Sequence, residues 1–324
     1  MGRSNAVVVL GAGFSKPLGG PLLGELLSEP YLDSSRASAD ALQWMTATLA
    51  ERRLSQPNFS IEDLFTEVWR DARTGEKVAE AALRELTIHL ASVCTALRPK
   101  TQRKSFAQYV DFFAALHANH DRLTIVSFNY DLVLEAALDR ADILYDYGNA
   151  PDLFFDDNAR RRKLNRRGAD VQILKLHGSA NWGVCRGCKK ADKSDDQVIA
   201  YEDGYVPWRR RACPLCNERY LESGIIPPVF GKAGETRHVR DAWRQAREQL
   251  RYAHHVLVVG YSLPPSDHEA RSLLRETQQS KNRMQVDIVC GERGGSAEYA
   301  HVFPGVQDWQ CRFEDYLQAL NGEA

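Results

Sequence analysis

Five short, mainly apolar segments recur along this chain, and patterns typical of helices separate most of them. The segments are residues 7–10, 123–128, 171–178, 255–262 and 285–292. Strands of a parallel sheet read as continuous apolar runs, because helices cover both faces of such a sheet. The alternation of strands and helices therefore predicts an α/β fold with a Rossmann-like, doubly wound parallel sheet.

A polar, cysteine-bearing stretch at about residues 182–228 interrupts this alternation. We therefore expect one Rossmann-like domain made of residues 1–181 and 229–324, with a small inserted module between its two parts. Several amphipathic patterns at about residues 30–120 predict a helical module within that domain.

The interrupting stretch carries two Cys-x-x-Cys pairs with 24 residues between them. Two thiolates on a tight turn can face one ion, and two such turns complete a tetrahedral zinc site. The predicted ligands are Cys185, Cys188, Cys213 and Cys216. Four thiolates leave no coordination position open, so this zinc would be structural. A different metal, a lost metal or a redox pair are the alternatives.

Composition excludes some classes of function. The formal net charge is −1, so no overall field attracts nucleic acid or a membrane. No apolar run approaches the roughly 20 residues that span a bilayer, and the first residues lack a secretory layout. We expect a cytoplasmic protein without a membrane partner. The basic runs at 160–167 and 209–211 fit solvated segments or a phosphate- or partner-binding patch, so a nucleic-acid contact stays open.

Polar residues and glycines follow the predicted strands. Gly11-Ala12-Gly13 follows the first, and the sequences SFNYD, LHGSANW and GYSLPPSD follow three others. Ligands of doubly wound sheets bind outside the carboxyl ends of the strands, where these loops converge. The dinucleotide fingerprint would place a third glycine at the position of Lys16, so the glycine turn alone is a weak signal.

The order of these motifs resembles the sirtuin family across nearly the whole chain. The motifs are GAG-x-S, N-x-D, L-H-G followed by the two cysteine pairs, and G-x-S-L. Their particular forms are more similar to bacterial sirtuin-like proteins than to the histone-deacylating branch. The resemblance implies an NAD-binding Rossmann-type domain, a zinc ribbon and a helical module, with NAD between them.

The resemblance also implies roles for individual residues. Asn129 would hold the ribose and the attacking water, His177 would be the general base, and Asp131 would contact the nicotinamide amide. The other implied cofactor-binding residues are Gly11, Ala12, Gly13, Phe14, Ser15, Pro21, Gly260, Tyr261, Ser262 and Gly291. The alternatives are a helix cap at Asn129, a first-turn acid at Asp131 and a structural histidine at the strand end.

One departure from the family bears on the reaction. Sirtuins continue the first loop with G-I-P-D-F-R, whereas here Gly19-Gly20-Pro21 is followed by Leu22, Leu23 and Gly24. The missing residues help place nicotinamide in deacylases, and the stretch 223–232 does not match their peptide-binding segment. Both differences favour water as acceptor, and hence an NAD⁺ hydrolase.

The alternatives are an NAD-dependent deacylase or ADP-ribosyltransferase, and a non-catalytic ADP-ribose sensor. The resemblance further implies an NAD-depleting effector of anti-phage defence, a homo-oligomer, and a partner ATPase or nuclease.

Overall fold

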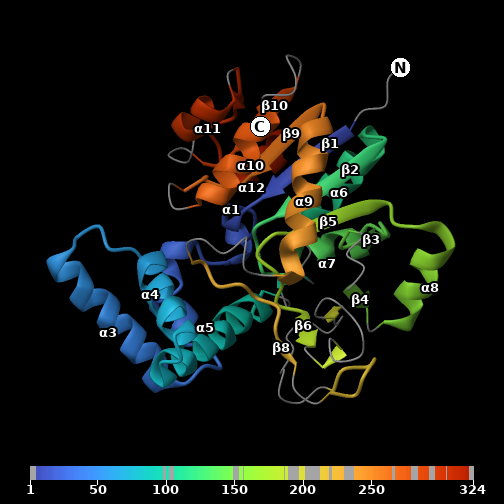
Figure 1. The fold of residues 1–324 in the computed structure, drawn as a ribbon. Coiled ribbons are helices and arrows are strands. Elements are labelled where there is room, and N and C mark those ends of the chain that lie inside the picture. The colour runs from blue at the N-terminus through green and yellow to red at the C-terminus, as the bar shows by residue number, and fades with distance from the viewer. Residues whose placement is uncertain are drawn as a thin grey trace.

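A computed structural model describes most of the chain (Figure 1). The described residues are 5–97, 100–101, 106–148, 153–155, 157–185, 187–188, 197–200, 212–218, 221–229, 237–264, 267–278, 284–291, 296–303 and 305–320.

The centre of the molecule is a parallel sheet of seven strands with the order β11-β10-β9-β1-β2-β5-β3. Its strands are β1 (Asn5–Leu10), β2 (Arg122–Ser127), β3 (Tyr145–Asp146), β5 (Val171–Lys175), β9 (His255–Val259), β10 (Gln285–Val289) and β11 (Gln307–Asp308). Residues Ala6–Leu10 of β1 pair with β2 on one side and with β9 on the other. The chain builds outward from β1 in one direction and then returns to build in the other. The predicted doubly wound sheet is confirmed, with its switch point between β1 and β9.

Helices cover both faces of this sheet. Almost every residue of the central strands is therefore buried. α9 (Arg237–Tyr252) lies in front of the strands in Figure 1, with α10 (His268–Gln278) packed against it. α6 (Ala107–Asn119) packs against β2 and α7 (Val133–Arg140). α11 (Ser296–Val302) contacts α10, and α12 (Phe313–Leu320) is the last helix of the described residues. Apolar faces of these helices complete the core.

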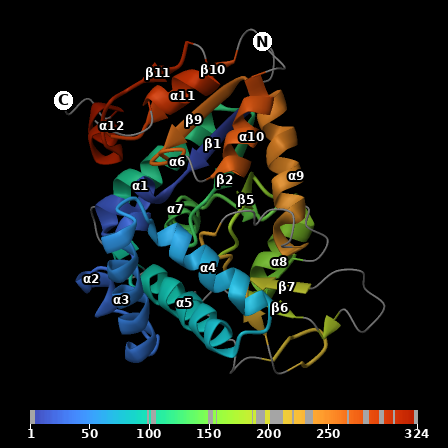
Figure 2. The same ribbon diagram turned by 60° about the vertical axis from the view of Figure 1, so that its left-hand side comes forward.

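A second group of helices lies beside the sheet (Figure 2). It consists of α2 (Glu29–Leu32), α3 (Ala39–Ser55), α4 (Ile61–Arg73) and α5 (Lys77–Thr95), and it has a hydrophobic core of its own. Helix α4 starts at a capping box, in which the Ser60 hydroxyl accepts from the Asp63 amide at 3.1 Å. Within the predicted module of about 30–120, α6 differs, because Phe112 and Phe113 belong to the core of the sheet.

The segment around the cysteines forms a separate, smaller sheet with the order β4-β7-β6-β8. Its strands are β4 (Leu153–Phe155), β6 (Trp182–Cys185), β7 (Gln197–Ala200) and β8 (Glu222–Ser223), and α8 (Asn158–Arg167) follows β4. Strand β6 of this smaller sheet begins only seven positions after the end of β5, so the loop between β5 and β6 joins the two sheets.

Short helical turns follow β1. They are α1 (Ala12–Ser15) and the 3₁₀ turns Lys16–Leu18 and Leu23–Glu25. Among the described residues, no helix combines the length and apolar character that crossing a membrane requires.

Candidate functional site

A cavity of about 1020 Å³ lies at the carboxyl ends of the central strands. Residues that follow β1, β2, β5, β9 and β10 all contribute to its wall. The predicted site residues that line it are Ala12, Gly13, Ser15, Pro21, Asn129, Asp131, His177, Gly260, Tyr261, Ser262 and Gly291. Its position beside the switch point is the usual ligand position of such sheets.

The glycines of the first loop let two loops pack closely. A Cβ added to Gly13 would lie 2.6 Å from the Gly260 Cα, and the Gly13 amide donates to the Gly260 carbonyl at 2.8 Å. Gly260 itself has a positive φ of 65°, which favours glycine. The loops after β1 and β9 are therefore joined backbone to backbone, and the Gly13 N–H has its partner within the protein.

Two predicted cofactor-binding residues, Gly11 and Phe14, do not line the cavity but contact residues that hold its first loop in place. The Phe14 side chain is fully buried and contacts Tyr109, Phe113 and Phe313. The Gly11 carbonyl accepts a hydrogen bond from the side chain of Asn129 at 2.9 Å. Both residues fix the loop that carries the lining residues Ala12, Gly13 and Ser15.

The amide of Asn129 is held in one orientation. Its Nδ2 donates to the Gly11 carbonyl at 2.9 Å and lies 3.4 Å from the Ser15 hydroxyl. Both amide hydrogens have acceptors in the first loop, which leaves the side-chain oxygen as the acceptor of this amide. Asn129 precedes α7 by several residues, and its amide does not cap that helix.

Ser15 and Asp131 bind each other. The Ser15 hydroxyl donates to Asp131 Oδ2 at 2.7 Å, and Asp131 Oδ1 accepts from the Val133 amide at 3.0 Å. The second contact forms a local turn at the start of α7. It resembles the alternative in which Asp131 is an acid at the first turn of that helix. The bond between Ser15 and Asp131 links the loop after β1 to the loop after β2, and so holds Asn129 of the second loop against the first.

A buried ion pair lies behind these loops. Lys175, at the end of β5, donates to Glu135 Oε1 at 3.0 Å and to the Asp131 carbonyl at 2.6 Å. Tyr147 donates to the same Glu135 oxygen at 3.1 Å. Burial raises the pKa of the Glu135 carboxyl, and the charge of Lys175 acts in the opposite direction. The sequence motifs gave no sign of this pair, which fixes the backbone of Asp131.

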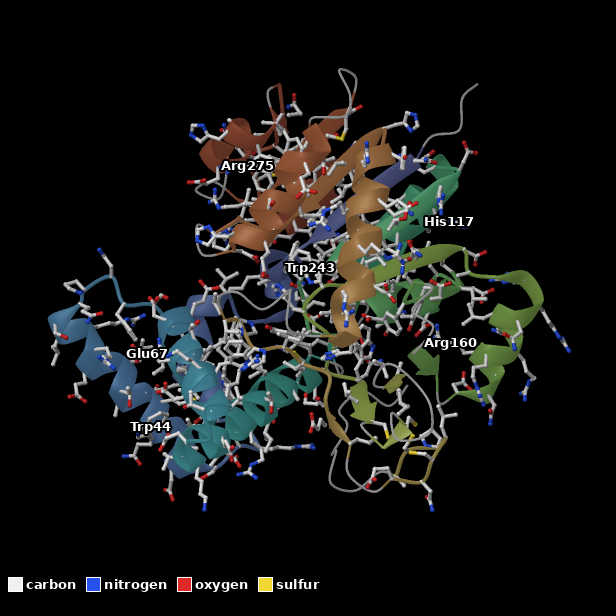
Figure 3. The ribbon with its side chains drawn as sticks, in the orientation of Figure 1. Trp44, Glu67, His117, Arg160, Trp243 and Arg275 are labelled. Atoms are coloured by element: carbon white, nitrogen blue, oxygen red, sulfur yellow. The ribbon has the colours of Figure 1, made fainter. Side chains whose placement is uncertain are left out.

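His177 sits in a loop with several anchors. Its carbonyl accepts from the Ile226 amide at 3.0 Å. Trp243, a residue of α9 that Figure 3 labels, donates its indole N–H to the preceding Leu176 carbonyl at 3.0 Å. The next residue, Gly178, has a φ of 74° and packs directly on the Gly224 carbonyl. The imidazole is buried, with the ring of Phe128 edge-on at 5.1 Å. The sequence prediction that Asn129 and His177 share one cavity agrees with this arrangement.

Asp267 is a cavity residue without a role in the sequence analysis. Its Oδ2 lies 4.0 Å from His177 Nε2 and accepts from the Tyr261 hydroxyl at 2.6 Å. Burial, together with the charge of Asp267, raises the pKa of Tyr261 well above its usual value, so this hydroxyl keeps its proton and donates. An acid a few residues beyond a strand end was the available signal, in the sequence GYSLPPSD.

Lys16, at the position of the absent fingerprint glycine, closes the loop that follows. Its ammonium contacts Glu25 Oε2 at 2.6 Å, and the same oxygen accepts from the Leu22 amide at 2.7 Å. Both ends of the 16–25 loop are therefore joined. Leu22, Leu23 and Gly24, which replace the charged and aromatic residues of sirtuins, line the cavity.

The four predicted zinc ligands lie together. The Sγ atoms of Cys185 and Cys216 are 3.5 Å apart, those of Cys188 and Cys213 are 3.6 Å apart, and all four lie within 4.8 Å of one another. Zinc–sulfur bonds of about 2.3 Å in a tetrahedron require sulfur atoms roughly 3.8 Å apart. The cluster fits one zinc ion with four thiolate ligands.

We expect Cys213→Ser to lower the zinc content well below one ion per chain and the melting temperature by several degrees, because metal binding contributes to folding. Metal analysis and thermal unfolding measure these effects. Cys311→Ser, outside the cluster, is the matched control. A Cys213→Ser protein with unchanged metal content would contradict the assignment.

Part of the basic sequence lies on α8, and residues 209–211 are outside the described residues. Arg160 contacts Asp139 and stacks on the Tyr145 ring at 4.2 Å, whereas Arg162, Lys163 and Arg166 are exposed. The arginine-rich run is thus a helix in which Arg160 is held against the sheet domain, Arg167 pairs with Asp170 at 2.8 Å, and the other basic side chains named here face solvent.

Comparisons with known proteins find similar solved structures. Three similar solved structures are a Sir2 with a p53 peptide and NAD⁺, Sir2Tm bound to a propionylated peptide, and a structure on the mechanism and regulation of Sir2 enzymes. The identities are 15%, 15% and 16%, and the TM-scores are 0.45, 0.44 and 0.46. The matches cover 98%, 99% and 98% of this chain and 92%, 94% and 91% of the other chains. A search of the curated proteins finds no match.

The family model described as SIR2-like domain matches residues 123–294, which is more than half of the 324 residues. This range contains Asn129, His177, the four clustered cysteines and Asp267. The chain belongs to the SIR2-like domain family.

Proposed function

We propose that this protein hydrolyses NAD⁺ at the bond between nicotinamide and ribose, releasing nicotinamide and ADP-ribose. The observation that carries the proposal is that Asn129, with its amide held in one orientation, and the His177 imidazole line the same large cavity at the strand ends. Membership of the SIR2-like family supports NAD as the substrate, and one similar solved structure is named as a Sir2 complex with NAD⁺.

The chemistry needs few groups. Loss of nicotinamide leaves positive charge on the ribose, as glycoside cleavage does. The side-chain oxygen of Asn129 would accept a hydrogen bond from the attacking water and so orient it. His177 would accept a proton from the ribose hydroxyls or the water, the usual role of a histidine general base.

Water is favoured over a peptide acceptor by the segment after β8. All four backbone groups of Gly224 and Ile226 bind within the chain. The Gly224 amide donates to Trp182 O, the Gly224 carbonyl contacts His238, the Ile226 amide donates to His177 O, and the Ile226 carbonyl accepts from Tyr130. Pro227 and Pro228 have no N–H to offer. An extended acyl-lysine peptide would find few backbone groups to pair with here.

Chromatography of products from purified protein and NAD⁺ tests the reaction. We expect equal amounts of nicotinamide and ADP-ribose, and no O-acyl-ADP-ribose when an acylated peptide is added. In ¹⁸O-water the ADP-ribose should carry the label, because water supplies the new hydroxyl. Formation of O-acyl-ADP-ribose, or transfer of ADP-ribose to protein, would replace hydrolysis with one of the alternative reactions.

The proposal includes a cytoplasmic location, where NAD⁺ is available and clustered thiols stay reduced. A homo-oligomer, a partner ATPase or nuclease, and a role in anti-phage defence stay predictions of the sirtuin resemblance.

A further inference from the structure

Two side chains that can accept hydrogen bonds lie close together in the cavity. His177 Nε2 and Asp267 Oδ2 are 4.0 Å apart, and each side chain is 8% exposed. Asp267 comes from the loop between β9 and α10, and His177 from the loop after β5. Strand order therefore brings together two residues that are 90 positions apart in the sequence.

The position of the carboxylate is fixed independently of any ligand. Tyr261 donates to Oδ2 at 2.6 Å, and the Ala270 amide in the first turn of α10 lies 3.4 Å from Oδ1. The Tyr261 ring is stacked on Phe128 with a centroid distance of 4.1 Å and an interplanar angle of 6°. Phe128 in turn contacts the His177 ring at 5.1 Å. One aromatic stack therefore sets the positions of both acceptors.

Other charged groups in the cavity wall have different surroundings. Asp131 binds Ser15 and the Val133 amide, and Lys16 pairs with Glu25. The further titratable groups of the wall are Glu62, Cys94, Tyr130, Cys290, Arg312 and Glu314. Among the residues that the structure describes, Asp267 is the carboxylate that lies within ion-pair distance of His177, at 4.0 Å.

We propose that Asp267 is a substrate-binding residue. It would accept a hydrogen bond from the 2′-hydroxyl of the ribose that carries nicotinamide in NAD⁺, while His177 accepts from the adjacent 3′-hydroxyl. A carboxylate is the usual protein partner of ribose hydroxyls in dinucleotide sites. Carboxylate oxygens have several acceptor positions, so the bond from Tyr261 leaves room for a ligand hydroxyl. The negative charge of Asp267 would also stabilise the positive charge that develops on the ribose during cleavage. This inference rests on the proposed NAD⁺ hydrolysis.

The test compares Asp267→Asn with the wild-type protein on NAD⁺ and on an NAD⁺ analogue without the 2′-hydroxyl of the nicotinamide ribose. Asparagine keeps the shape of the side chain and its capping ability. For NAD⁺ we expect kcat/KM to fall about 10- to 100-fold, the effect of losing a hydrogen bond to a charged group. For the analogue the fall should be less than about 3-fold, because the missing hydroxyl and the missing charge remove the same contact. Equal losses on both substrates would overturn the inference.

Glu298→Gln is the matched control, because Glu298 pairs with Arg271 of α10 at 2.7 Å and is not in the cavity wall. We expect it to hydrolyse NAD⁺ at the wild-type rate. Calorimetry with ADP-ribose and its 2-deoxyribose counterpart gives a readout without turnover: Asp267→Asn should weaken binding of the first and leave the second nearly unchanged. If the wild type binds both ligands but cleaves no NAD⁺, this comparison still decides the role of Asp267 while the hydrolase proposal fails. If Asp267→Asn cleaves NAD⁺ like the wild type, hydrolysis stands and the role of Asp267 falls.

Discussion

Asn129→Ala and His177→Ala are each expected to lower the rate of nicotinamide release from NAD⁺ by about 10²- to 10⁴-fold, the usual contribution of a positioned base or an orienting group. Asn129→Asp should be similarly inactive despite its similar size. A carboxylate has no N–H to donate to the Gly11 carbonyl and would repel that oxygen. Chromatographic measurement of nicotinamide at saturating NAD⁺ tests these expectations.

His255→Gln is the control for a general effect of histidine loss. His255 is the first residue of β9. It therefore lies at the amino-terminal ends of the strands, away from the cavity at their carboxyl ends, and pairs with Asp287 at 2.7 Å. Its variant should keep wild-type hydrolysis. If Asn129→Ala and His177→Ala proteins with unchanged melting temperatures still released nicotinamide at the wild-type rate, the proposed site would be wrong.

The central sheet was accessible from the sequence because its strands are buried on both faces. Residues 123–128 and 255–262 read as apolar runs, and β2 and β9 lie within one residue of the expected starts. Strands β3 and β11 contain two residues each, too few for any pattern. The strands of the small second sheet were not predicted individually, since each has four residues or fewer, and β4 lies outside the segment that carries the cysteines.

The sequence predicted more about which residues line the cavity than about the contacts between them. The rule that strand ends converge predicted one shared cavity for Asn129 and His177, and both residues line it. No local pattern indicates that the Ser15 hydroxyl binds Asp131, because the two residues are 116 positions apart. The same holds for Asp267 and His177, which are 90 positions apart, and for Lys175 and Glu135, which are 40 positions apart. Motifs identify residues that follow a strand, whereas their partners depend on strand order.

Lys175→Met is expected to destabilise the protein by about 3–5 kcal/mol, because it leaves a buried carboxylate without its cation. Lys175 and Glu135 are 1% and 4% exposed, so solvent does little to screen their attraction. The double variant Lys175→Met with Glu135→Leu should recover roughly 2 kcal/mol of this loss, since neither charge remains buried. Urea unfolding at pH 7.5 measures both effects. An equal loss in the single and the double variant would show that the pair itself is not the cause.

The pH dependence of the single variant gives a second, independent check. Burial already raises the pKa of Glu135, and loss of Lys175 removes the group that opposes this shift. Between pH 5.5 and 7.5 the native variant would then hold a proton on Glu135 that the unfolded chain has released. A native state with more bound protons loses stability as the pH rises, so Lys175→Met should be less destabilised at pH 5.5 than at pH 7.5. The double variant, which has no carboxyl at this position, should lack that difference, and a pH dependence shared by both variants would assign the effect to another group.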